Sequence, residues 1–145
     1  FEYIEEPLYA YYQHDSSTVH TITVKRCEDR MEAGRIMLRE AKEYGYLETY
    51  RPELEYSFAN LFYVNTLFTY MQGVRPVRLR FVRELGKEMK ETFPDFQENR
   101  YYRERMGDEE KKLVSMQLSS TVFFVLYYKL LWGYRNFRKR LSGKK

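Results

Sequence analysis

The sequence is poor in the residues that build disulfides, metal centres and phosphate-binding loops. Its 145 residues include one cysteine, two histidines and seven glycines. A lone cysteine, Cys27, cannot form an internal disulfide, and no stretch resembles a signal peptide, so we expect a reducing, cytoplasmic compartment. The glycines form no phosphate-binding pattern, which argues against nucleotide binding by this chain alone. No apolar run reaches the roughly 20 residues that cross a bilayer.

Acidic residues are absent from the end of the chain, although the whole chain carries a net charge of +4. The segment "YRNFRKRLSGKK" holds six lysines and arginines, which leaves 19 basic against 21 acidic residues before it. A mildly acidic body argues against a nucleic-acid surface, so no nucleic-acid partner is expected. The basic tail is compatible with contact to anionic lipid or phosphate.

The rest of the composition is typical of a folded domain. Hydrophobic residues make up 43% and charged residues 32% of the chain, and its length is enough for one hydrophobic core. Aromatic residues reach 18%, including 15 tyrosines and 10 phenylalanines. We expect them both in the core and on a surface that meets an amphipathic partner.

Hydrophobic periodicity predicts a mainly α fold, a small bundle of about five helices with one short N-terminal β-strand segment. The weakly alternating residues 1–12 give the strand. A stripe of spacing three and four starts at Val24 and predicts a helix to about Gly45, with Thr23 as N-cap. Further helices are predicted at about 52–71, from Pro76, from a cap at Asp108, and over 120–140.

Two of the predicted helices carry faces that could meet a partner. In the helix after Pro76, four basic residues share one side, which we interpret as a solvated face, with a lipid or partner contact as the alternative. The last helix is apolar almost all round in its first half, which predicts a core position there. Its second half is predicted to lie in a membrane interface. The membrane-contact candidates are Trp132, Tyr134, Arg135, Phe137, Arg138, Lys139 and Arg140.

No catalytic residue and no metal site are predicted within the chain. His14 and His20 are six residues apart, with Cys27 seven further on, and this spacing matches no structural zinc motif. Hydroxyl residues lie close to both histidines, but no orienting third group accompanies them. The adjacent acids Glu28 and Asp29 are interpreted as part of a solvated helix face.

One stretch carries a family resemblance. The segment "EPLYAYYQHDSSTVHT", residues 6–21, has a Pro-Leu-Tyr run, further aromatics, a histidine and a serine-rich turn. It resembles the end of the catalytic domain in bacterial family 2 glycosyltransferases, which are inverting enzymes of surface-glycan synthesis that use sugar nucleotides. The segments "FANLFYVNTLF" and "FPDFQEN" and the aromatic, basic last helix look more loosely like the helical C-terminal regions of that family.

This resemblance implies two parts, with residues 1–22 ending a catalytic domain and residues 23–145 forming a helical C-terminal domain. The chain opens at Phe1 rather than methionine, so we expect it to be a piece of a longer protein. The family's acidic metal motif and catalytic base would lie upstream. The piece itself is therefore expected to be non-catalytic and to hold no cofactor, while a divalent metal and a sugar nucleotide are implied for the full-length enzyme.

The resemblance also suggests site residues and partners. His14, with Ser16, Ser17 and Thr18, would lie at the diphosphate or metal edge of the enzyme, where a loop can donate hydrogen bonds to the leaving group. The alternative is a loop that only closes the domain edge.

The expected partners are the upstream catalytic domain and an anionic membrane surface at the inner face of the plasma membrane, and an exposed aromatic helix could equally form a homodimer. The expected role is structural, acceptor-side or membrane-docking. The alternative is an independent helical protein-interaction module.

Overall fold

A computed structural model of the chain describes residues 22–143, and within them every regular element is helical. The elements are α1 (Val24–Glu43), α2 (Tyr46–Thr49), α3 (Arg51–Ser57), a π-helical segment η1 (Phe58–Val64), α4 (Asn65–Gly73), α5 (Leu79–Thr92), a 3₁₀ turn η2 (Phe96–Glu98), α6 (Arg100–Arg105), α7 (Asp108–Ser119) and α8 (Thr121–Leu141). The mainly α fold is confirmed. The predicted N-terminal strand and the boundary at residue 22 fall at or outside the edge of the described residues.

The first helix follows its sequence pattern closely. The Thr23 hydroxyl accepts a hydrogen bond from the backbone N–H of Arg26, at 3.2 Å, which satisfies one of the free donors at the helix start. The predicted stripe is the buried one, since Cys27, Met31, Gly34 and Ala41 all face the core. Cys27 is 1% exposed and therefore behaves as a small core hydrophobe.

The predicted helix at 52–71 is confirmed as one continuous rod of α3, η1 and α4, and its middle is π-helical. A π turn holds more residues than an α turn, so it rotates the following side chains relative to an α-helical pattern. The sequence predicts an inner stripe of Leu54, Phe58, Leu61, Asn65 and Phe68 for this helix, with Phe62, Leu67 and Met71 beside it. Of these residues, Phe58, Leu67 and Met71 are buried and Leu54, Phe62 and Phe68 are half-buried, whereas Leu61 and Asn65 are exposed. Beyond Phe58 the buried side is formed by Tyr63, Val64, Thr66, Leu67, Tyr70 and Met71.

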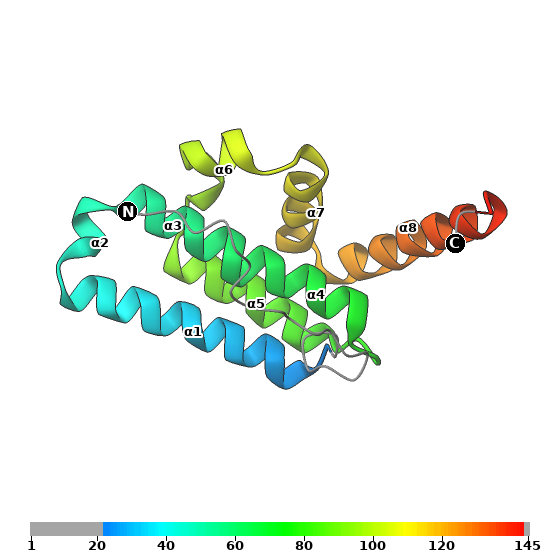
Figure 1. Cartoon of the computed structure of the whole chain (residues 1–145), viewed down its shortest axis with the longest axis horizontal. Coiled ribbons are helices and arrows are strands. Elements are labelled where there is room, and N and C mark those ends of the chain that lie inside the picture. The colour runs from blue at the N-terminus through cyan, green and yellow to red at the C-terminus, as the bar shows by residue number, and fades with distance from the viewer. Residues whose placement is uncertain (1–21, 144–145) are drawn as a thin grey trace, which may run out of the picture.

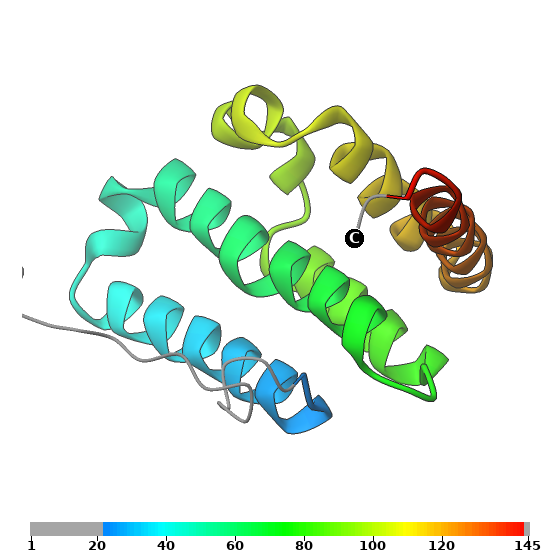
Figure 2. The ribbon, with the colours of Figure 1, turned by 45° about the vertical axis from the view of Figure 1, so that its right-hand side comes forward.

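This rod lies between α1 and α5. In Figure 1, α1 lies below the rod, and α6 and α7 lie above it. The helix α8 packs on α7 and α5 and then extends away from the other helices. Figure 2 shows α8 nearly end-on, next to α7. The core between these helices is strongly aromatic, and its largest fully buried side chains include Tyr63, Tyr70, Tyr102, Phe58, Phe96 and Phe124.

The prediction that Pro76 opens the next helix is wrong. Residues 74–78 form a non-helical link that bends at Arg75 and Pro76, and α5 begins at Leu79 with Arg78 as its cap. The backbone N–H of Arg78 donates to the hydroxyl of buried Tyr70, at 3.0 Å, so a tertiary contact sets the start of the helix. The basic side chains predicted to share a solvated face, Arg80, Arg83, Lys87 and Lys90, are all exposed.

Two details further along the chain also differ from the prediction. The connection after α5 contains a helix, α6, which the sequence pattern did not indicate. Its N-cap is Asn99, whose side-chain oxygen accepts from the backbone N–H groups of Tyr101 and Tyr102. Asp108 is the first residue of α7 rather than its cap, and Gly107 stands at the cap position.

Candidate functional site

The described residues hold no evident reaction centre. Within residues 22–143, no group of three histidine, cysteine, aspartate or glutamate side chains is placed to hold a metal ion. Burial raises the pKa of the Cys27 thiol, which disfavours a reactive thiolate. The candidates of the predicted diphosphate edge, His14, Ser16, Ser17 and Thr18, lie outside the described residues. The features that remain are an exposed helix face and a surface groove.

The most prominent of these surfaces belongs to α8, which has two different faces. Ser120 caps the helix, its hydroxyl accepting from the backbone N–H of Phe123. Phe124, Val125 and Tyr128 are buried against the body of the protein, so this side of the first half is core, as predicted. The side facing away from the body is exposed although it is apolar, so the predicted core position is wrong for this side of the helix.

A stack of aromatic rings holds the buried side of α8 in place. Tyr128 stacks on Phe68 of α4, with ring centroids 6.0 Å apart, and on Trp132, at 5.1 Å and an interplanar angle of 10°. The guanidinium of Arg135 lies 5.2 Å from the Trp132 ring centroid. It also donates to both carboxylate oxygens of Glu109 in α7, at 2.7 and 2.8 Å. This hydrogen bond raises the pKa of Arg135.

The opposite side of α8 is an exposed apolar stripe that runs along the whole helix. Residues spaced three and four apart lie on one helix face. We define the α8 stripe as Phe123, Leu126, Tyr127, Leu130, Tyr134, Phe137 and Leu141. Leu130 is 74% exposed and Leu141 72%. A single exposed leucine is ordinary, but a contiguous row of exposed apolar residues marks an interaction surface. Within residues 22–143, nothing covers this face.

Basic side chains border the α8 stripe on both edges. Arg138 follows Tyr134 by four residues, and Arg140 follows Phe137 by three. These spacings place each arginine beside the stripe, on opposite sides of it. Lys139 follows Trp132 by seven residues and so lies on the packed side of the helix. Of the predicted membrane-contact residues, Tyr134, Phe137, Arg138 and Arg140 thus gather at one face, whereas Trp132 and Arg135 fasten α8 to the body.

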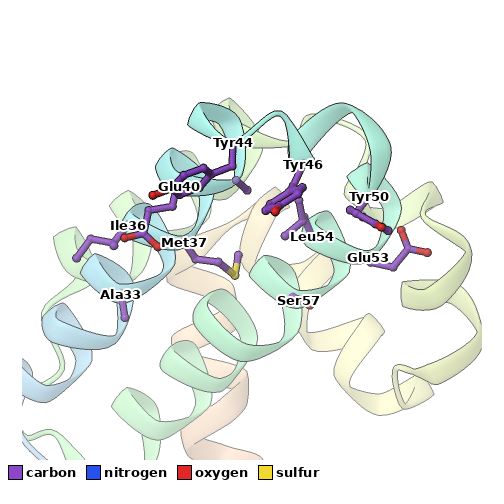
Figure 3. Close-up of a pocket in the computed structure, with 11 residues that line it drawn as sticks. Ala33, Ile36, Met37, Glu40, Tyr44, Tyr46, Tyr50, Glu53, Leu54 and Ser57 are labelled. Carbon is purple, nitrogen blue, oxygen red and sulfur yellow. The ribbon is translucent and has the colours of Figure 1, made fainter.

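A second surface feature is a groove of about 710 Å³ between the C-terminal half of α1 and the segment α2–α3 (Figure 3). Three tyrosines, Tyr44, Tyr46 and Tyr50, stand along its rim, and each is more than half exposed. Met37 and Leu54 contribute apolar surface to it. We call this feature the tyrosine groove. The sequence does not indicate this groove, because its three tyrosines lie in a segment predicted to end the first long helix.

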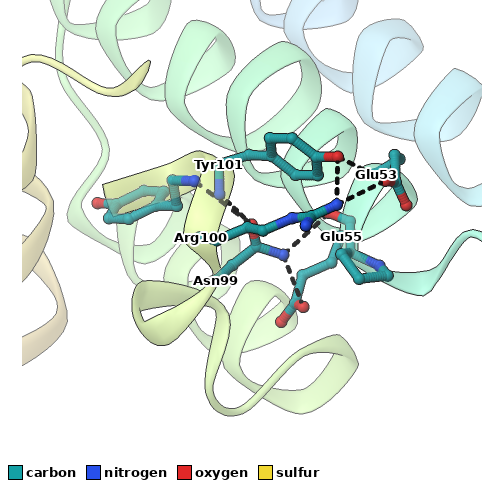
Figure 4. Close-up of polar contacts among 7 residues, drawn as sticks. Glu53, Glu55, Asn99, Arg100 and Tyr101 are labelled. Atoms are coloured by element: carbon teal, nitrogen blue, oxygen red, sulfur yellow. Dashed lines mark hydrogen bonds and ion pairs between the residues drawn. The ribbon is translucent and has the colours of Figure 1, made fainter. Parts of the chain in front are cut away.

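A polar network fixes the end of the tyrosine groove at α3 (Figure 4). The Tyr101 hydroxyl donates to Oε1 of Glu53, at 2.6 Å, and Arg100 approaches the same oxygen at 3.4 Å. Asn99, 8% exposed, donates from Nδ2 to the carbonyl of Pro52 and to Glu55. The hydrogen bond from Tyr101 is the main reason why the pKa of Glu53 is lowered, so this carboxylate is charged at neutral pH.

Comparisons with protein families, with curated proteins and with solved structures give no match for this chain. Among the described helices, none combines the length and apolar character that a membrane crossing demands.

Proposed function

We propose that this chain is a non-catalytic helical region that docks on an anionic membrane surface through the α8 stripe. The observation that carries the proposal is the second apolar face of α8, which is exposed along the whole helix and bordered by Arg138 and Arg140. A helix that lies in a membrane interface needs such a face, with basic residues beside it that reach the lipid headgroups.

The way α8 is held supports the same role. The stack of Tyr128 and Trp132, together with the pair of Arg135 and Glu109, fixes the side opposite the stripe. The helix therefore does not need to leave the body in order to present the stripe. An interface helix that is already folded and oriented loses less conformational entropy on binding than one that folds there.

Co-sedimentation with vesicles tests the proposal. The probe is a vesicle of phosphatidylethanolamine and phosphatidylglycerol, and we expect the chain to sediment with it at low salt and to be released as sodium chloride is raised. The double variant Leu130→Ser/Phe137→Ser is expected to remain in solution. Leu61→Ser is the matched control, because Leu61 is 50% exposed but lies on η1, and it should bind like the parent chain.

Substitutions of single basic residues in α8 give a second test of vesicle binding. A lysine or arginine near an anionic surface contributes roughly 1 kcal/mol, so Arg138→Gln should weaken vesicle binding about fivefold. Lys139→Gln removes the same charge from the packed side of the helix and should weaken binding less. Equal losses for both variants would mean that only total charge matters, which contradicts docking by the stripe.

Self-association is the competing use of the α8 stripe. Tyr127, Leu130, Tyr134, Phe137 and Leu141 alternate at spacings of three and four, as at the seam of a coiled coil. Analytical ultracentrifugation distinguishes the two uses. A concentration-dependent dimer that Leu130→Ser abolishes, together with no vesicle binding, would replace the docking proposal by the homodimer and the protein-interaction module.

We further propose that the enzyme served by this region is a family 2 glycosyltransferase of bacterial surface-glycan synthesis. Residues 6–21 and their resemblance to the end of that family's catalytic domain are the support for this assignment. The test is the intact mass of the endogenous polypeptide that contains this sequence. A mass well above 17.8 kDa, with an acidic metal motif upstream and turnover of a sugar nucleotide, is expected. A mass close to 17.8 kDa would contradict it.

A further inference from the structure

The tyrosine groove owes its shape to two breaks in the helical backbone. Gly45, between α1 and α2, has φ 74°, a left-handed conformation that glycine adopts without strain. Tyr50, between α2 and α3, has φ −116° and ψ 30°. In one straight helix, residues 46 and 50 would share a face and residue 44 would lie on the opposite side. The turn at Gly45 instead brings Tyr44 to the same rim as Tyr46 and Tyr50, as Figure 3 shows.

The rings on this rim are close together without stacking on one another. The ring centroids of Tyr44 and Tyr46 are 6.2 Å apart, with an interplanar angle of 34°. Those of Tyr46 and Tyr50 are also 6.2 Å apart, at 60°. Tilted rings at this spacing leave parts of their faces accessible. The face of an aromatic ring carries negative potential and attracts a cation within about 6 Å of its centroid.

All charged residues that line the groove are acidic, namely Glu40 and Glu53. Arg100 partly neutralises Glu53 from outside the groove, at 3.4 Å. Glu40 is exposed and forms no ion pair with any residue that the structure describes, so it supplies most of the negative charge. The groove therefore combines aromatic faces, an apolar wall with Met37 and Leu54, and carboxylates.

We infer that the tyrosine groove binds a small quaternary ammonium cation. Such an ion has a positive charge that is weakly hydrated and surrounded by methyl groups. The methyl groups suit the tyrosine faces and the apolar wall, and the charge suits Glu40. A compact, strongly hydrated ammonium such as that of lysine would lose more hydration on entering, and an anion would be repelled by the carboxylates. This inference is independent of docking by α8.

A nuclear magnetic resonance titration of the whole chain with choline tests the inference. We expect saturable shifts of the tyrosine ring signals. The uncharged carbon isostere 3,3-dimethyl-1-butanol has nearly the same shape and should bind at least about tenfold more weakly, because it lacks the cation. Phosphocholine, which adds a phosphate near Glu40, should also bind more weakly than choline. Equal binding of the isostere, or tighter binding of phosphocholine, would overturn the inference.

Variants locate the site. Tyr46→Leu and Glu40→Gln should each weaken choline binding, whereas Tyr46→Phe keeps the ring and should retain most of it. Tyr134→Leu is the matched control, because Tyr134 is 62% exposed but belongs to the α8 stripe. These positions are exposed, so the variants should fold. No shift with choline, or the same loss with Tyr134→Leu as with Tyr46→Leu, would contradict the site.

The two proposals fail separately. The vesicles that test α8 docking contain no choline headgroup, and free choline reports only on the groove. A chain that binds vesicles but not choline would lose this inference and keep the docking function.

Discussion

At the scale of single residues, Gly34 shows how little free space the core has. A Cβ added there would lie 2.6 Å from Cγ of Phe62, a ring atom close to the backbone that cannot move aside easily. We expect Gly34→Ala to lower the free energy of unfolding by about 1–3 kcal/mol, through overpacking. Chemical denaturation measures this change.

Gly133 provides the control for Gly34. It lies within α8, and a Cβ added there would meet nothing within 4 Å. Because alanine favours helix more than glycine does, Gly133→Ala should stabilise α8 locally by up to about 1 kcal/mol. Destabilisation by Gly133→Ala equal to that by Gly34→Ala would show that the contact with Phe62 is not the cause.

A buried hydrogen-bond network joins the central rod to α5 and α7. The Tyr63 hydroxyl donates to Oε1 of Gln117, whose Nε2 donates to the carbonyl of Val82, at 2.8 Å. Gln117→Leu would leave the buried hydroxyl of Tyr63 without its acceptor, at a cost of about 1–3 kcal/mol. Adding Tyr63→Phe removes the unsatisfied group, so the double variant should lose less than the sum of the single losses. Full additivity in denaturation experiments would contradict this network.

Tyr102 gives the fold a dependence on alkaline pH. Burial, with a smaller effect of the Glu110 charge, raises its pKa to about 12. The unfolded chain releases this proton near about pH 10, while the folded chain still holds it. Stability is therefore fully present below about pH 10 and is lost as the pH rises toward about 12. Tyr102→Phe should flatten the fall of the melting temperature in this range, and Tyr134→Phe, an exposed tyrosine, should not.

At the scale of elements, the sequence predicts the boundaries of those helices that begin and end at local signals such as caps. Thr23 caps α1 as predicted, and the pattern of residues 120–140 predicts α8 within one residue at each end. The sequence predicted the rod of α3, η1 and α4 as a helix, but it predicted the buried face only in part, at Phe58, Leu67 and Met71. The π turns of η1 shift the register after Phe58, and apolar residues on both possible stripes made the two registers equally plausible in the sequence.

Other boundaries depend on contacts that a local pattern does not contain. The beginning of α5 is set by the hydroxyl of Tyr70, and α6 is tied to α3 through Asn99. The division of α8 into a buried and an exposed face likewise depends on packing that the local sequence does not contain. An all-round apolar segment is compatible with a fully buried helix, and only the packing shows that Tyr128 is covered while Leu130 is not.

At the scale of the whole molecule, the acidic tyrosine groove and the basic end of α8 lie far apart along the long axis. The tyrosine groove, with Glu40 and Glu53, lies at the end of the molecule formed by α2 and α3. The basic end of α8 projects at the opposite side (Figure 1). A chain docked through the α8 stripe would thus keep the acidic groove away from an anionic surface. This arrangement lets the two proposed sites act without competing.

Of these two proposed sites, the sequence alone suggests the one on α8. The concentration of aromatic and basic residues near the end of the chain predicted a contact face there, although not that Trp132 and Arg135 would be used to hold the helix. The tyrosine groove could not be predicted in this way. It depends on the left-handed Gly45 and on the way the rod of α3, η1 and α4 returns along α1, and neither is visible in the spacing of the tyrosines.

The most direct test of the central claim is to place a fluorescent reporter on each side of α8. On a Cys27→Ala background, an environment-sensitive nitrobenzoxadiazole dye is attached to Leu130→Cys in the stripe or to Asn136→Cys, four residues after Trp132 on the other side. With phosphatidylglycerol vesicles at low salt, the dye at 130 should shift to shorter wavelength and the dye at 136 should not. No shift at 130, or equal shifts at both positions, would contradict docking through the α8 stripe.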